Sequence, residues 1–115
     1  MPEPTIDPGT FAELQETAGA EFVAELVDTF LEEAPTMLVE LRDARSEADV
    51  DRFRRAAHSL KSNSHTFGAL ALGALARELE LTGMDADPAR DNARIDALES
   101  EYARAAAELK GRRRG

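Results

Sequence analysis

The chain has 115 residues, carries 23 acidic and 14 basic side chains for a formal net charge of −9, and contains no cysteine. Its length suits one domain with one hydrophobic core, and its charge argues against nucleic acid as the main partner, because a phosphate backbone would be repelled. The lack of cysteine excludes disulfides and thiolate metal sites, and the lack of a signal peptide or a long apolar run predicts a cytoplasmic protein that does not enter a membrane.

A short helix is predicted near the N-terminus. Two start signals compete there, an aspartate followed by proline at 7–8 and a capping box from Thr10 to Glu13. Gly19 is the expected end, because glycine readily adopts the backbone conformations that close a helix.

A long helical pattern follows, in which apolar residues repeat at steps of three and four between residues 20 and 44. Pro35 interrupts it, and a proline inside a helix removes one backbone hydrogen bond. The segment is therefore either one kinked helix or two shorter helices that separate near Ala34.

Three more helices are predicted in the second half of the chain. Asp49 is a candidate N-cap for the first of them, which Gly68 ends or bends. Its expected buried residues are Phe53, Ala56 or Ala57, Leu60, Ser64 and Phe67. The next helix points its leucines inward and places three charged residues largely outward, namely Arg77, Glu78 and Glu80. After a loop at 82–88, a last helix restarts at Asp87-Pro88 and carries an apolar seam to about Lys110.

No segment alternates with the period of a strand, so the fold is expected to be all-α. Four amphipathic helices joined by short turns predict an antiparallel up-down-up-down four-helix bundle, with the short N-terminal helix covering one end. We expect a single domain over 1–115, with its core at about 8–110 and a basic tail at 111–115. A bundle with a closed core is expected to be a monomer.

The third of these helices holds both histidines of the chain and one of its two lysines. Residues three, four and seven apart share a helix face, which places Arg54, Lys61, Ser62 and His65 beside His58. His58 is therefore expected to be exposed or half-exposed in mid-helix, with Lys61 on the same outer face.

Several interpretations of this histidine compete. The simplest is a solvated polar face. A metal site formed by His58 and His65 fits poorly, because two helical turns separate them by about 10 Å and Lys61 would repel a cation. Serine–histidine catalysis lacks a strained turn and a third member, and the many acidic residues are mostly solvated rather than paired for acid–base hydrolysis.

The remaining interpretation is a histidine that acts as a nucleophile toward phosphorus. Such a ring must be exposed, Lys61 would neutralise the phosphoryl oxygens, and the small Ser62 would leave room for a partner. The chain contains no P-loop and no kinase glycine loop. It would therefore carry a phosphoryl group without being an enzyme that makes one.

The sequence His-Ser-Leu-Lys at 58–61, with Gly68 ten residues after the histidine, resembles the histidine-containing phosphotransfer (HPt) domain family. The stretch at 30–35 and the Leu-Glu pair at 79–80 are also similar to that family, so the resemblance covers roughly residues 22–80. It implies that His58 accepts the phosphoryl group, that Lys61 is its neighbouring cation and that Gly68 has a structural role.

The resemblance also implies partners. They are a response-regulator receiver domain, whose aspartate exchanges the phosphoryl group with His58, and a sensor or hybrid histidine kinase in a two-component phosphorelay. No cofactor of its own is expected, and magnesium belongs to the receiver. Arg54, Ser62 and His65 are expected to lie near the docked partner, although Ser62 stands where the family usually has glycine.

Two alternatives remain open. The bundle could use the same face to dock a receiver or a kinase without being phosphorylated, or it could be the phosphorylated segment of a larger kinase. His65 is a second candidate acceptor, but it lacks the Leu-Lys pattern that follows His58.

Overall fold

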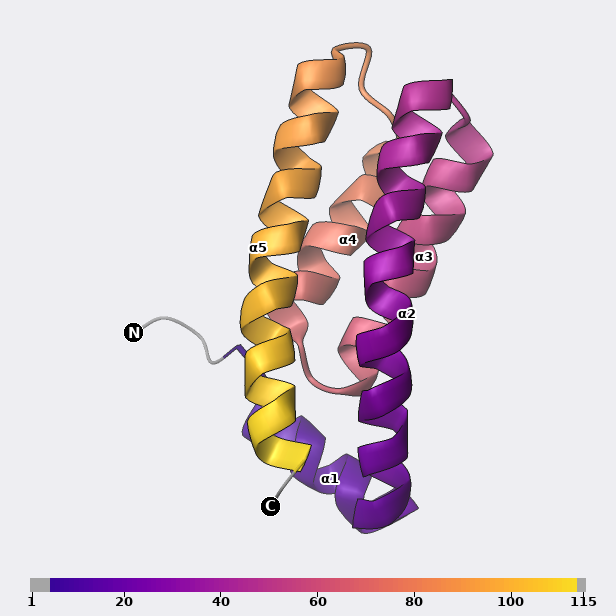
Figure 1. Ribbon diagram of the computed structural model, residues 1–115. Helices are drawn as coiled ribbons and strands as arrows, with labels where there is room; N and C mark the ends of the chain where they lie inside the picture. The colour runs from indigo at the N-terminus through magenta and orange to yellow at the C-terminus, as the bar shows by residue number, and fades with distance from the viewer. Residues whose placement is uncertain (1–4, 114–115) are drawn as a thin grey trace.

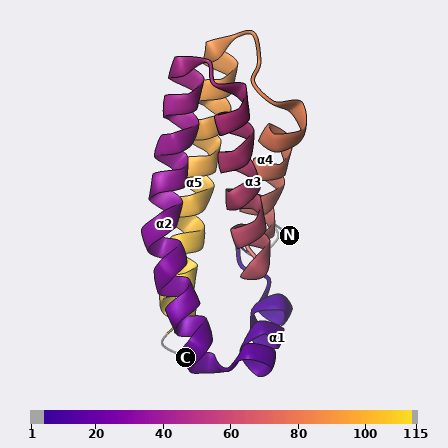
Figure 2. The same cartoon turned by 90° about the vertical axis from the view of Figure 1, so that its right-hand side faces the viewer.

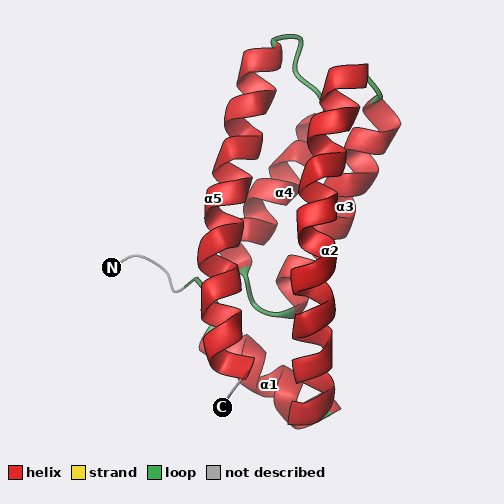
Figure 3. Cartoon of the chain, viewed as in Figure 1, coloured by secondary structure: helices red, strands yellow, loops and turns green. Residues whose placement is uncertain are grey.

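A computed structural model describes residues 5–113, which form five helices and, within that range, no strand. The helices are α1 (Pro8–Ala18), α2 (Ala20–Glu47), α3 (Val50–Thr66), α4 (Leu70–Thr82) and α5 (Pro88–Arg113). The four longer helices pack side by side, and α1 lies across the end of the molecule at which α5 finishes (Figures 1 and 3). The all-helical prediction is confirmed. Over the described residues, no helix is both long and apolar enough to cross a membrane.

One continuous hydrophobic core joins all five helices. Its aromatic centre is Phe30, whose ring lies 5.4 Å from that of Phe67 and 5.9 Å from that of Tyr102. The buried side chains of α3 are the expected ones, and both alternatives at 56 and 57 are buried: Phe53, Ala56, Ala57, Leu60 and Ser64. Because α3 buries this stripe, its opposite side faces solvent.

Asp7, rather than the capping box from Thr10 to Glu13, starts α1. The Asp7 carboxylate accepts hydrogen bonds from the backbone N–H of Thr10 at 3.0 Å and from its hydroxyl at 2.6 Å. These bonds lower the pKa of the Asp7 carboxyl, with the hydroxyl contributing most. The predicted stop at Gly19 is confirmed, since Gly19 caps α1 with a φ of 93°.

The segment before α1 also holds the turn between α3 and α4. The backbone N–H of Asp7 donates to the Gly68 carbonyl at 2.8 Å. Gly68 has a φ of 80°, and a Cβ at this position would lie 3.0 Å from the Thr10 Cβ and 3.1 Å from the Asp7 carbonyl oxygen. Glycine is therefore required here both by conformation and by space. Figure 2 shows α1 below the ends of α3 and α4 that this turn joins.

The opposite end of the molecule is held by a buried carboxylate that the sequence did not single out. Asp91 is fully buried, and it accepts hydrogen bonds from the backbone N–H of Asp85 and from the Arg94 guanidinium. The Arg45 guanidinium lies 3.5 Å away. Asp91 thereby links the loop after α4 to both α2 and α5. These contacts give the buried carboxylate the polar partners that a buried charge requires.

The start of α3 agrees with the sequence-based boundary, whereas the end of α5 differs from it. Asp49 caps α3 as predicted, accepting a hydrogen bond from the Arg52 N–H at 3.1 Å. At the other end of the chain, α5 continues to Arg113, so helix replaces the first part of the predicted basic tail. Within it, Arg112 pairs with Glu108 and its guanidinium lies over the Phe11 ring. Residues 1–4 and 114–115 lie outside the described part.

Pro35 lies inside α2 without dividing it, so the alternative of two shorter helices is wrong. Proline has no backbone N–H, and the carbonyl it leaves without its usual partner is that of Leu31. The Tyr102 hydroxyl of α5 donates to this carbonyl at 3.4 Å. A side chain 71 residues away in sequence thus partly satisfies the carbonyl that Pro35 frees.

We expect Tyr102→Phe to lower the free energy of unfolding by about 1 kcal/mol, because the Leu31 carbonyl then loses its donor. In a Pro35→Ala background the alanine N–H supplies that donor, so the same change should cost less. Urea unfolding followed by circular dichroism measures all four members of this double-mutant cycle. An equal cost of Tyr102→Phe in both backgrounds would contradict this role of the tyrosine.

Candidate functional site

The outer side of α3 carries His58 in mid-helix, with its side chain 58% exposed. The neighbouring Ala57 and Leu60 are fully buried, so the backbone beneath the ring is anchored in the core. This matches the expected exposure of His58. Because His58 lies in the middle of α3, its backbone is held by the hydrogen bonds of the helix.

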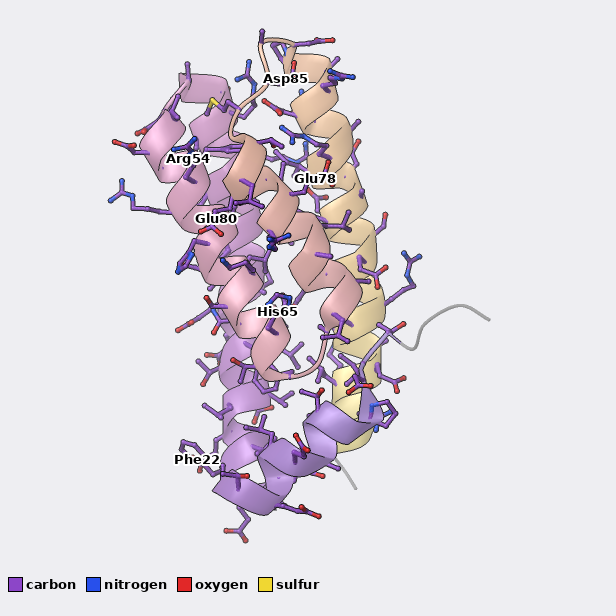
Figure 4. The ribbon with its side chains drawn as sticks, turned by 180° about the vertical axis from the view of Figure 1, so that it is seen from behind. Phe22, Arg54, His65, Glu78, Glu80 and Asp85 are labelled. Carbon is purple, nitrogen blue, oxygen red and sulfur yellow. The ribbon has the colours of Figure 1, made fainter. Side chains whose placement is uncertain are left out.

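The ring is held from the neighbouring helix by Glu80, in the last turn of α4. One carboxylate oxygen, Oε2, contacts the Nδ1 atom of His58, and the other, Oε1, accepts a hydrogen bond from the Lys61 ammonium at 2.6 Å. Figure 4 shows Glu80 on the α3 side of α4 and Glu78 on the side toward α5. The prediction that Glu80 points outward is wrong, since its side chain is only 22% exposed.

The charge state of Glu80 decides which nitrogen of His58 is available. The hydrogen bond from Lys61 is the largest influence on the Glu80 pKa and lowers it; contacts with His58 lower it further, and burial opposes them. The carboxyl is therefore ionised at neutral pH and can only accept hydrogen bonds. It follows that Nδ1 of the neutral ring carries the proton and that Nε2 holds the lone pair.

An open depression lies beside the ring. It is lined by Arg54, Arg55, His58, Ser59 and Glu80. The Nε2 atom of His58 has no hydrogen-bond partner among residues 5–113. The His58 ring thus has one unbonded nitrogen and shares the lining of an accessible depression with two arginine side chains.

The predicted site residues are only partly brought together. Glu80 joins Lys61 to His58, but Lys61 is half-buried between α3 and α4 rather than on the outer face. Ser62 is exposed and lies outside the lining of the depression. The His65 ring rests against Gly73 of α4, where a side-chain Cβ would collide with it. His65 is therefore held away from His58.

Two residues of the site were missed from the sequence. Arg55 was not singled out, although it lies three residues before His58 and so shares its face. Glu80 was placed on the wrong side, yet it follows the buried Leu79 directly and must flank the core stripe of α4. The resemblance noted for the Leu-Glu pair at 79–80 was a second local signal for it.

No group of three or more histidine, cysteine or acidic side chains within residues 5–113 is arranged to hold a metal ion. His58 and His65, the histidines considered for such a site, contact different residues of α4, Glu80 and Gly73.

Comparisons with known proteins give a consistent result. The family model of the Hpt domain matches residues 25–108. The crystal structure of histidine-containing phosphotransfer protein B (HptB) from Pseudomonas aeruginosa PAO1 is similar over 98% of this chain and 97% of that one, with 30% sequence identity and a TM-score of 0.82. A search of curated proteins gave no match.

We expect Glu80→Gln to remove a pH-dependent part of the stability. The pKa of Glu80 is lower in the folded chain than its ordinary value of 4.5, so the ionised carboxylate stabilises the fold above that pH. This contribution is lost as the pH falls through the lowered pKa. Urea unfolding at pH 7 should therefore find Glu80→Gln less stable than the wild type, with the difference shrinking at acid pH.

Glu78→Gln is the matched control, because the Glu78 side chain has no hydrogen-bond or ion-pair partner among the described residues. A stability difference between wild type and Glu80→Gln that stays constant with pH would show that the carboxylate contacts do not stabilise the fold.

Proposed function

This chain belongs to the Hpt domain family, and from that premise we propose that it relays a phosphoryl group through His58, exchanging it with the aspartate of a response-regulator receiver domain. Its broader role is histidine phosphotransfer in a phosphorelay, and proteins of this family are phosphocarriers rather than kinases. We propose three things in addition: that His58 is the acceptor, how it reacts, and with which partners it exchanges the phosphoryl group.

One observation carries the choice of His58. Its ring is exposed, its Nδ1 is held by an ionised carboxylate, and its Nε2 is left with a lone pair beside an open depression. A nucleophile toward phosphorus needs this combination of orientation and access. Among residues 5–113, no carboxylate contacts the His65 ring, and His65 does not line the depression.

The transfer step follows from this geometry. The Nε2 lone pair attacks the phosphorus of an aspartyl phosphate, the bond between phosphorus and the aspartate oxygen breaks, and the aspartate leaves as a carboxylate. The ring keeps its Nδ1 proton and becomes positively charged, and this charge faces Glu80. No proton has to move, and the reverse step returns the phosphoryl group by the same path.

Lys61 is proposed as a cation for the phosphoryl oxygens. In support, its ammonium is bonded to the same carboxylate that holds the His58 ring. Magnesium is assigned to the receiver, where it would neutralise the aspartyl phosphate, and no cofactor is assigned to this chain. A sensor or hybrid histidine kinase would supply the phosphoryl group to the relay.

We expect incubation with a phosphorylated receiver to give an adduct that is acid-labile and base-stable, as phosphohistidine is. His58→Gln should abolish it, and His65→Gln should retain it. Mass spectrometry under basic conditions locates the modified residue. Labelling that persists in His58→Gln, or receiver binding without any transfer in the wild type, would contradict the proposal; the second result would favour a docking module that is not phosphorylated.

We expect Lys61→Ala to slow transfer by about tenfold while the phosphoryl group still reaches His58, because one nearby positive charge is lost. Its effect on stability should be about 1 kcal/mol or less, since the ion pair with Glu80 is partly solvated. Rapid-quench kinetics and urea unfolding measure the two effects. An unchanged transfer rate in a folded variant would remove Lys61 from the mechanism.

A further inference from the structure

We infer that Arg54 and Arg55 together bind the phosphoryl oxygens on His58, as two guanidinium groups that approach the Nε2 atom from either side. This inference rests on the proposed function of His58 and assigns the anion-binding part of the same site. It concerns residues that the motif around His58 does not contain.

The first observation is the way in which arginines are paired. Most described guanidinium groups form ion pairs with carboxylates, as expected in a chain with excess acid: Arg42, Arg45, Arg52, Arg90, Arg94, Arg104 and Arg112. Within residues 5–113, Arg54, Arg55 and Arg77 have no carboxylate within 4.0 Å. Two of these three line the depression beside His58. Two arginines without a carboxylate partner therefore place their positive charge at the site, although Lys110 of α5 also has no carboxylate within 4.0 Å among the described residues.

The second observation concerns Lys61. Its ammonium is bonded to Glu80 at 2.6 Å, so its charge is already balanced by a carboxylate in the resting site. A phosphoryl group brings close to two negative charges next to that same carboxylate. The site then needs further positive charge, and guanidinium groups without a carboxylate partner supply it without first breaking an ion pair. Arg55 donates a 3.4 Å hydrogen bond from its Nε to the Asp51 carbonyl.

The third observation is where the two side chains lie. Arg54 and Arg55 are four and three residues before His58, so they flank it on the helix surface. Arg54 lies on the α4 side, where its guanidinium passes within 3.4 Å of the place a Cβ of Gly83 would occupy. Arg55 lies on the α2 side, where it also lines the groove that contains Met37 and Glu40. Figure 4 shows Arg54 and Glu80 on the same face of the molecule.

Chemistry favours the phosphoryl group as the ligand of this pair. A guanidinium presents parallel N–H donors that match two phosphoryl oxygens, and it keeps its charge at every physiological pH. The chain as a whole is negatively charged, with a net charge of −9. A local cationic pair is therefore what allows a phosphorylated group to approach this face.

The test uses phosphoramidate as the donor, so that no partner protein takes part. In this reaction Nε2 attacks phosphorus, the phosphorus–nitrogen bond of phosphoramidate breaks, and ammonia leaves. We expect Arg54→Gln and Arg55→Gln each to slow phosphorylation of His58 by about fivefold, the effect of one exposed charge pair. The double variant should be slowed by more than either, and added salt should reduce the differences.

Arg77→Gln is the matched control, because Arg77 also has no carboxylate within 4.0 Å among the described residues but does not line the depression. It should leave the rate unchanged. Arg54→Lys keeps the charge and loses the forked donors, so an intermediate rate is expected. Thermal unfolding by circular dichroism checks that all variants retain the fold.

The outcomes separate the inference from the proposal on which it rests. If wild-type His58 accepts no phosphoryl group from phosphoramidate or from a receiver, the proposed function fails. If it does, but Arg54→Gln, Arg55→Gln and Arg77→Gln all react at the wild-type rate or are slowed equally, only the inference fails. Slowing that occurs with a phosphorylated receiver but not with phosphoramidate would mean that the guanidinium groups contact the partner's acidic side chains, which also overturns it.

Discussion

The contact of Glu80 with α3 is the constraint on which the site depends. A single carboxylate at the end of α4 bonds both His58 and Lys61, so the relative placement of two helices determines which ring nitrogen is free. That placement is fixed by buried residues of α4, such as Leu72 and Leu79, and by the short turn between the helices. The chemistry of an exposed histidine is thus set by packing beneath it.

The same contact places a negative charge, that of Glu80, beside the ring of His58, and nearby cations partly balance it. If His58 accepts the phosphoryl group as proposed, Glu80 would balance the positive imidazole and would also repel the phosphoryl oxygens. Lys61 bonds this carboxylate, and the two arginines line the same depression as Glu80. In the proposed transfer, attraction by these cations and repulsion by Glu80 would act together, so the phosphoryl group could be held and still be released.

Much of the fold could be predicted from local sequence. The helix caps at Gly19 and Asp49 and the buried stripe of α3 depend on residues a few positions apart, and these predictions are confirmed. The position of Glu80 could not be predicted in this way, because it depends on how α4 is rotated against α3. The same holds for the bond from Tyr102 to Leu31, whose partners lie 71 residues apart.

For the site, as for the fold, sequence spacing indicated which residues share a helix face but not which residues contact each other between helices. The sequence pattern indicated an exposed His58 beside cations, but it could not indicate that Lys61 is already engaged. Spacing places residues on a helix face, whereas ion pairs between helices depend on tertiary structure. The spacing of Arg55 from His58 was visible in the sequence, but the sequence could not show that Arg55 has no carboxylate partner within residues 5–113.

The close approach of Asp7 to Gly68 has a consequence for where this domain begins. The family match starts at residue 25, yet Ile6 and Phe11 are part of the core and the Asp7 N–H holds the turn that joins the two helices of the site. An excised fragment that keeps only the matched region would lose the backbone against which that turn is closed. The smallest transplantable unit of this phosphocarrier therefore includes the segment before its first helix.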